Sequence, residues 1–176
     1  MSNPQTLREF QAHLAQRLQS ARTKGVTAAW LAVEAGPSRL LLPLNHAGEI
    51  FPWTQVQKVP YVRSWFMGVA NLRGGLYGVV DLASFLQHGG GGRRPESESG
   101  QSHLVTFNPL LDAHCAVLVD RLLGLRGSEA FASSAAAGEG APAYFGHAYT
   151  DLQGGQWQEL NLQLLSRHPA FLGIAQ

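Results

Sequence analysis

One pattern occurs twice in the chain and constrains the fold more than any other feature. In the first copy, within Gly68 to Leu86, an apolar run, a polar Asn-Leu-Arg-Gly-Gly turn and a second apolar run are closed by Asp81-Leu82. In the second copy, Gly154-Gly155 is followed by Asn161-Leu162 at the same spacing. Each copy has the form of a β-hairpin that leads into a short helix capped by Asp81 or Asn161. The repetition indicates one supersecondary unit used twice.

The likeness extends to the segments that precede each hairpin. Leu31 to Val33 and Leu40 to Leu44 flank a Gly-Pro turn, and Val105 to Phe107 and Ala116 to Val119 flank an Asn-Pro turn. Short strands that recur between Gly, Pro, Asn and Asp residues are typical of small β-barrels or sandwiches rather than βαβ units. We therefore expect a mainly β protein with two similar β-subdomains.

Residues 1–25 follow a helical pattern instead. After Asn3-Pro4, an N-cap and first helical residue, apolar residues recur every three or four positions as far as Gly25: Leu7, Phe10, Leu14, Leu18 and Ala21. The sequence predicts an N-terminal amphipathic helix over 1–25 and a β-domain over 26–176. The apolar stripe either packs on the chain's own β-domain or docks on a partner or a second copy, so self-association through this helix is one expectation.

Two polar or small-residue stretches interrupt the β pattern. Residues 87–102 contain no apolar side chain, and their Gly, Pro, Glu and Ser content predicts a flexible loop between the subdomains. Ser133 to Ala143 is expected to be a second exposed connection. The chain is expected to end in a short helix after Asn161 and a tail in which Phe171, Leu172 and Ile174 pack back on the domain.

Composition favours protein partners over other ligands. Only 14% of the residues are charged, and 13 basic against 12 acidic residues leave a net charge of +1. A nucleic-acid-binding protein needs clustered Lys and Arg, so this class is not expected. The single cysteine, Cys115, forms no internal disulfide, and the chain shows neither a secretion signal nor 18 uninterrupted apolar residues. We expect a cytoplasmic protein without membrane insertion.

The sequence motifs of enzymes and metal sites are missing. The usual phosphate-loop, zinc and nucleophile-elbow patterns do not occur, and the seven histidines are scattered. General acid-base catalysis requires convergent acidic or histidine side chains, and no such pair is visible. We expect no catalytic residues, no metal site, no cofactor and no enzymatic activity.

The motifs in the first half follow an order that resembles CheW-domain proteins. These motifs are Val59-Pro60, Trp65 to Gly68, Asn71 to Gly74 and Val79 to Leu82, with support from Ala47 to Ile50 and Ala116 to Arg121. Together the similar segments cover roughly residues 28 to 165. The resemblance implies two SH3-like five-stranded β-barrels. The N-terminal extension, the phrase GVANLRG and the ending HPAFLGI are most similar to family members of type IV pilus chemosensory systems.

The resemblance also implies a function and its residues. CheW-like proteins are adaptors between methyl-accepting chemotaxis receptors and CheA-type histidine kinases, so these are the expected partners. The implied receptor-binding residues are Glu49, Asn71, Arg73 and Gly74, and the implied kinase-binding residues are Trp65, Phe66 and Gly68. Glu49 and Arg73 are expected to form an ion pair, which either only holds the barrel or also shapes the receptor surface.

Three alternatives remain at this point. Flagellar chemotaxis is the second choice of output after twitching motility. A small ligand-binding β-barrel would need an enclosed apolar cavity, and a hydrolase would need convergent His and Asp or Glu side chains in one cleft. One departure from the family lies inside the main motif, where Gly78 stands in place of the usual proline and the strand is expected to be a sheet edge.

Overall fold

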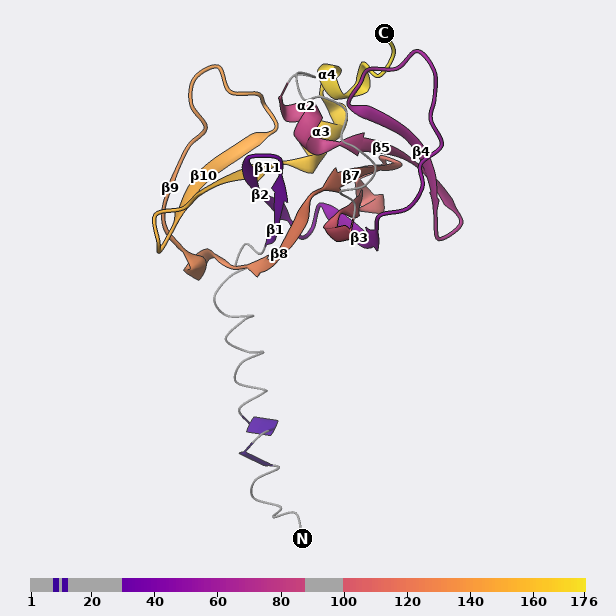
Figure 1. Ribbon diagram of the computed structural model, residues 1–176. Coiled ribbons are helices and arrows are strands. Elements are labelled where there is room, and N and C mark those ends of the chain that lie inside the picture. The colour runs from indigo at the N-terminus through magenta and orange to yellow at the C-terminus, as the bar shows by residue number, and fades with distance from the viewer. Residues whose placement is uncertain (1–7, 10, 13–29, 88–99) are drawn as a thin grey trace.

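The computed structural model describes residues 8–9, 11–12, 30–87 and 100–176, which form two β-sheets with short helices beside them (Figure 1). Sheet A has six strands in the order β8-β1-β2-β11-β10-β9. Their bounds are β8 Arg121–Arg126, β1 Trp30–Ala35, β2 Ser38–Pro43, β11 Gln156–Leu160, β10 Phe145–Asp151 and β9 Phe131–Ala135. Sheet B has five strands in the order β3-β6-β7-β5-β4. Their bounds are β3 Ala47–Pro52, β6 His103–Phe107, β7 Cys115–Val119, β5 Gly75–Asp81 and β4 Phe66–Leu72.

The predicted duplication is present, and its two copies exchange their first hairpins. Sheet A combines β1 and β2 of the first copy with β8 to β11 of the second, whereas sheet B combines β3 to β5 with β6 and β7. The exchanged hairpins join through parallel pairs, β2 with β11 and β7 with β5. Each sheet therefore contains residues from both halves of the sequence.

The expectation of two closed five-stranded barrels is wrong. In the described chain no strand pairing joins β8 to β9 or β3 to β4, so both sheets are open, and sheet A has six strands. The additional strand is β9, which begins just before the stretch that we expected to be an exposed connection. It forms because the Phe131 ring packs against Trp30 and Tyr149, at centroid distances of 5.7 and 5.2 Å.

Three short α-helices gather between the sheets at one end of the molecule (Figure 1). They are α2 Leu82–Leu86, α3 Leu162–Arg167 and α4 Pro169–Leu172, and the 3-10 turns η2 Pro109–Leu111 and η3 Ser128–Ala130 lie in loops. The predicted caps are confirmed, because Asp81 accepts a hydrogen bond from the Ser84 amide and Asn161 accepts one from the Leu164 amide. In the tail, Phe171 is buried as expected, but Leu172 is 60% exposed.

The largest apolar core lies between the two sheets and draws on both. It contains Leu31, Val33, Leu40 and Leu42 from sheet A and Val80, Val105, Val117 and Val119 from sheet B. Two smaller clusters belong to one sheet each, around Leu41 in sheet A and around Leu104 in sheet B. Within the described ranges, no helix is long and apolar enough to cross a bilayer.

Two expectations fall on residues outside the described ranges. The helix expected over 1–25 is described only at residues 8–9 and 11–12, which are helical and exposed. The loop expected over 87–102 is described only at its two ends.

Candidate functional site

The turn between β4 and β5 has the tightest geometry of the family-like motif. Leu72 pairs with Gly75, so Arg73 and Gly74 form a two-residue hairpin loop. Both have positive φ, 49° and 81°, which is the type I′ turn that matches the twist of the flanking strands. The Asn71 side chain accepts a hydrogen bond from the Gly74 amide at 3.0 Å. The turn therefore presents the Arg73 side chain from a fixed backbone.

Glu49 lies on β3, and hydrogen bonds fix its backbone as well. The register between β3 and β6 shifts between Ala47 and Ile50, which leaves the backbone of Glu49 outside the regular ladder. The buried Thr106 hydroxyl replaces the missing ladder hydrogen bonds. It accepts from the Glu49 amide at 2.8 Å and donates to the Glu49 carbonyl at 3.2 Å. Thr106 was not predicted, although a hydroxyl in an otherwise apolar strand was a visible signal.

The predicted ion pair joins these two elements. The Arg73 Nη1 atom donates to Glu49 Oε1 at 3.0 Å, and the guanidinium lies 5.9 Å from the centre of the Phe51 ring, also on β3. Because β3 and β4 are opposite edges of sheet B, these contacts show that the sheet curls until the tip of one edge hairpin meets the other edge. No feature of the sequence indicated the contact between Arg73 and Phe51.

The pair is open to solvent, with exposed side-chain fractions of 75% for Arg73 and 53% for Glu49. Exposed ion pairs contribute at most about 1 kcal/mol to stability. The four residues expected to bind a receptor, Glu49, Asn71, Arg73 and Gly74, thus meet in one exposed place, where the ion pair itself adds little to the stability of the fold.

The residues expected to bind a kinase lie at the other end of β4 and differ in exposure. Trp65 is 6% exposed and packs edge-on against Phe85, so its ring belongs to the core. Phe66 is partly buried and covers Gly78, where a Cβ atom would lie 3.1 Å from the ring. The predicted kinase contact therefore concerns the exposed edge of β4, which is an edge strand of sheet B, rather than the buried Trp65 ring.

Gly68 builds that edge through its backbone. Its φ is 134°, and a Cβ atom there would lie 2.0 Å from the Gln57 carbonyl oxygen. The missing side chain lets Gln57 and Val69 exchange two backbone hydrogen bonds of 2.8 and 2.9 Å. This short bridge covers the middle of β4.

Gly78 is not on an edge strand, which corrects the sequence expectation. β5 lies between β4 and β7, and the Gly78 amide donates to the His114 carbonyl at 3.0 Å. Proline has no amide hydrogen and could not make this bond. Glycine in place of proline therefore allows this backbone hydrogen bond and leaves room for the Phe66 ring.

Reactive groups do not converge in the part of the chain that the structure describes. No three His, Cys, Asp or Glu side chains there are placed to hold a metal ion. Burial raises the pKa of the Cys115 thiol to about 12, so it remains protonated and unreactive at neutral pH.

The interiors of the sheets are filled by side chains. Sheet B encloses Ala70, Leu72, Val79, Leu104, Ala116 and Leu118, and sheet A encloses Trp30, Ala32, Leu41 and Trp157. The packed interiors of the described sheets therefore do not support the alternative of a small ligand-binding β-barrel, which needs an enclosed apolar cavity.

Comparison with known proteins agrees with the motifs. A family model described as CheW-like domain matches residues 29–170. Protein PilI of Pseudomonas aeruginosa is 29% identical over 84 residues, which are 48% of this chain and 44% of PilI, so the match spans less than half of that relative. The crystal structure of the scaffolding protein TtCheW from Thermoanaerobacter tengcongensis matches with a TM-score of 0.60 and 15% identity, over 76% of this chain and 88% of that one. At this identity the structural match speaks for the fold alone.

Proposed function

Because the chain belongs to the CheW-like domain family, we propose that it is a non-enzymatic adaptor that couples a methyl-accepting chemotaxis receptor to a CheA-type histidine kinase. The similarity to PilI favours a chemosensory system that controls type IV pili and twitching motility, with flagellar chemotaxis as the second candidate. The adaptor would act in the cytoplasm and reach membrane receptor arrays through its protein partners.

The observation that carries the proposal is the exposed ion pair between Arg73 and Glu49. The turn that holds Arg73 has a backbone conformation that most L-residues avoid, and such strain concentrates where a side chain has a task. The side chain remains largely exposed although Glu49 and Phe51 both contact it. We assign this surface to the receptor.

The kinase is assigned to the β4 edge around Phe66 and Gly68. An adaptor must contact its two partners on different surfaces. The register between β4 and β5 shifts between Phe66 and Gly68, and this irregularity lies at the opposite end of β4 from the Arg73 turn. A kinase held there can respond to the receptor only if its active and inactive states make different contacts with the adaptor. Gln57 already pairs with the backbone of Val69, so the kinase would contact the rest of this edge and the partly buried Phe66 side chain rather than add a strand at Val69.

The first experiment is co-purification of the tagged full chain from its native source, followed by identification of the bound proteins. Recovery of both a receptor and a kinase supports the proposal, whereas recovery of neither contradicts it. Purified partners then allow a test of single residues.

The second experiment separates a structural ion pair from a receptor contact. Arg73→Ala should lower receptor affinity at least about tenfold, which corresponds to about 1.4 kcal/mol. Its melting temperature should stay within about 3 °C of wild type, because the lost pair is exposed. Arg121→Ala is the matched control, since Arg121 forms an ion pair of 3.3 Å with Glu34 at a side-chain exposure of 52% and 32%. It should leave receptor binding unchanged.

A charge swap completes the test. The double variant Glu49→Arg with Arg73→Glu keeps an ion pair between β3 and the turn but reverses its direction. If the receptor contacts Arg73 directly, the swap fails to restore binding. Full restoration of binding would show that the pair only holds the edges of sheet B together.

A further inference from the structure

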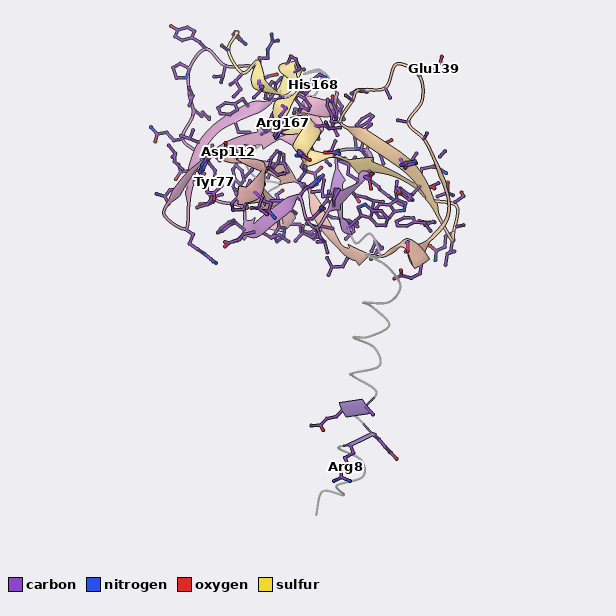
Figure 2. All side chains as sticks on the ribbon, turned by 180° about the vertical axis from the view of Figure 1, so that it is seen from behind. Arg8, Tyr77, Asp112, Glu139, Arg167 and His168 are labelled. Atoms are coloured by element: carbon purple, nitrogen blue, oxygen red, sulfur yellow. The ribbon has the colours of Figure 1, made fainter. Side chains whose placement is uncertain are left out.

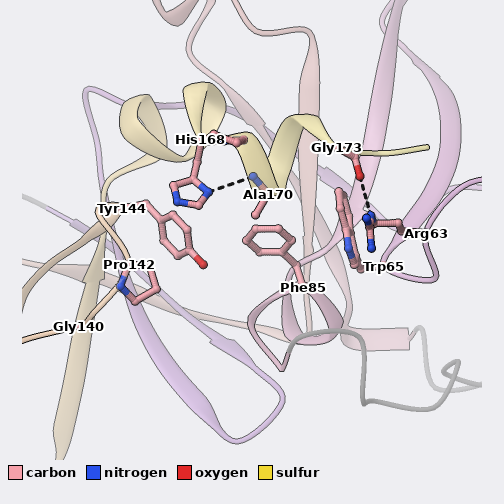
Figure 3. Close-up of a pocket in the computed structure, with 10 residues that line it drawn as sticks. Arg63, Trp65, Phe85, Gly140, Pro142, Tyr144, His168, Ala170 and Gly173 are labelled. Atoms are coloured by element: carbon pink, nitrogen blue, oxygen red, sulfur yellow. Dashed lines mark hydrogen bonds between the residues drawn. The ribbon is translucent and has the colours of Figure 1, made fainter. Parts of the chain in front are cut away.

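A groove of about 460 Å³ opens beside α4, at the end of the molecule where the three helices gather (Figure 3). The segment before β4, helix α2, the loop before β10 and α4 each contribute to its walls. Its volume falls in the usual range of small-ligand sites. The groove is distinct from the Arg73 turn: Figure 2 shows His168, which lines it, well away from Tyr77 on the β4–β5 hairpin.

The floor of the groove is aromatic and rigid. Trp65, Phe85 and Tyr144 line it and are only 6%, 5% and 4% exposed. Their rings pack against one another, with centroid distances of 5.0 Å between Trp65 and Phe85 and 5.9 Å between Phe85 and Tyr144. A planar apolar group could therefore lie on this floor without reordering its side chains.

The Tyr144 hydroxyl is an unused polar group in this floor. The residue is 4% exposed as a whole, but its hydroxyl oxygen is not among the buried polar atoms without a partner in the described chain, so it is open to the groove. Figure 3 shows the hydroxyl pointing into the groove beside Phe85. Burial raises the pKa of Tyr144, so the group remains an O–H donor at neutral pH. Because the hydroxyl is open to the groove, it can donate to a bound acceptor in place of water.

The other polar groups of the groove are also donors. Arg63 Nε donates to the Gly173 carbonyl at 2.8 Å, which orients the guanidinium and leaves its terminal nitrogens available. His168 Nδ1 accepts from the Ala170 amide at 3.2 Å, so the neutral ring carries its proton on Nε2. Among the described residues that line the groove there is no Asp or Glu. In Figure 3, Tyr144 and His168 lie at one end of the groove and Arg63 at the other.

We propose that this groove binds an aromatic carboxylate, with the ring on the Trp65, Phe85 and Tyr144 floor, the carboxylate against Arg63 and a second acceptor against the Tyr144 hydroxyl and His168. An arginine at one end fits a carboxylate because a guanidinium can donate to both of its oxygens. The same chemistry is offered by a free aromatic acid and by a protein chain that ends in an aromatic residue. The proposal is independent of the coupling function.

The test uses three small probes with the same ring and different charge: 4-hydroxyphenylacetate, its neutral amide and tyramine. Each is titrated into the 15N-labelled full chain while the indole signal of Trp65 is followed by NMR. The acid should shift this signal with saturation, and the amide and the amine should bind at least about tenfold more weakly. Equal binding of all three, or no shift with the acid, would overturn the proposal.

Two variants assign the contacts. Tyr144→Phe removes only a hydroxyl that faces the groove, so the melting temperature should stay close to wild type while the acid binds several-fold more weakly. Arg63→Gln should abolish the preference for the acid over the amide. Tyr149→Phe, a matched change in sheet A, should leave binding unchanged. Unchanged binding by both Tyr144→Phe and Arg63→Gln would refute the assignment.

Two further probes identify the source of the carboxylate. A short peptide that ends in tyrosine is compared with its C-terminal amide. If the peptide acid binds at least about tenfold more tightly than 4-hydroxyphenylacetate, the ligand is the end of a partner chain. If the free acid binds as tightly or more tightly, the ligand is a small molecule, and both results retain the aromatic carboxylate.

Discussion

The backbone at residue 73 favours a different amino acid from the one that its side-chain contacts require. A type I′ turn is most often Asn-Gly, because Asn and Gly tolerate positive φ, yet the first position here is Arg73. An L-residue other than Gly, Asn or Asp in this conformation costs roughly 1–2 kcal/mol. The contacts of Arg73 with Glu49 and Phe51 are partly exposed and recover little of this energy. A role in partner binding accounts for an arginine at this position.

This conflict predicts that Arg73→Asn separates stability from function. The asparagine relieves backbone strain, so the free energy of unfolding should rise by up to about 1 kcal/mol. Receptor affinity should fall by at least about tenfold, as for Arg73→Ala. Thermal melts and receptor titrations on the same preparations check both results. A loss of stability would show instead that the ion pair supports the fold.

Two glycines with positive φ are predicted to differ sharply in what they tolerate. Gly68→Ala forces a Cβ atom against the Gln57 carbonyl and breaks the bridge with Val69, so we expect a loss of about 3 kcal/mol or more. Gly74→Ala is the control, since a Cβ atom added there would meet nothing within 4 Å and only the conformational cost of about 1 kcal/mol applies. Urea unfolding of both variants measures the difference. Equal losses would mean that the close approach at Gly68 is unimportant.

At the scale of elements, the local pattern of the chain predicted the hairpins but not their partners. The turn residues, the caps at Asp81 and Asn161 and the paired cassettes all have local chemical causes, and the structure contains them. Which sheet a hairpin joins depends on long-range pairing, such as Leu40 with Gln158, and no local signal reports it. For the same reason β9 was missed, because its formation depends on the distant Trp30.

In the candidate site, too, residues with local causes could be predicted and residues placed by long-range pairing could not. Arg73, Gly74 and Asn71 could be predicted as a group because they share one turn, and Glu49 was added through the family resemblance. Phe51 and Thr106 support that site from β3 and β6. The Thr106 hydroxyl in an otherwise apolar strand was a local signal, but nothing in the sequence around Phe51 marks that residue. The expected edge at Gly78 was wrong because β7, from the second copy, pairs with β5.

The turn between β2 and β3 connects the two sheets and carries a titratable group. The Asn108 amide donates to the His46 carbonyl at 2.8 Å, and the buried Nδ1 atom of His46 has no hydrogen-bond partner in the described chain. Burial lowers the pKa of His46 from 6.5, and the nearby Glu159 carboxylate partly offsets this. Below about pH 6.5 the unfolded chain therefore binds a proton at His46 that the folded chain resists, so stability should fall as the pH falls.

We predict that His46→Gln weakens this pH dependence. Melting temperatures of wild type and variant are compared between pH 7.5 and pH 5.5, a window above the titration of ordinary carboxyl groups. The wild type should lose more stability across the window than the variant does. His147→Gln, a change at an exposed histidine, serves as the control and should behave as wild type. Identical slopes for His46→Gln and wild type would exclude His46 as the source.

At the scale of the whole molecule, the hairpin exchange makes each sheet depend on both halves of the chain. The chain passes from sheet A to sheet B after β2 and returns after β7, and the shared core between the sheets draws on strands of both. An adaptor that holds two partners needs fixed geometry between its contact surfaces, and a shared core resists independent movement of the sheets. The architecture therefore predicts cooperative unfolding of the two sheets.

Two substitutions outside the shared core test that cooperativity. Leu41 lies in the small cluster of sheet A and Leu104 in that of sheet B, and both are fully buried. Each change to alanine should cost about 2–5 kcal/mol. If the sheets unfold together, calorimetry should show one transition in wild type and in both variants, displaced to lower temperature in each, with equal calorimetric and van't Hoff enthalpies. If instead two transitions appear, and Leu41→Ala lowers the temperature of only one and Leu104→Ala only the other, the sheets unfold independently. A single shared transition would be displaced by both substitutions.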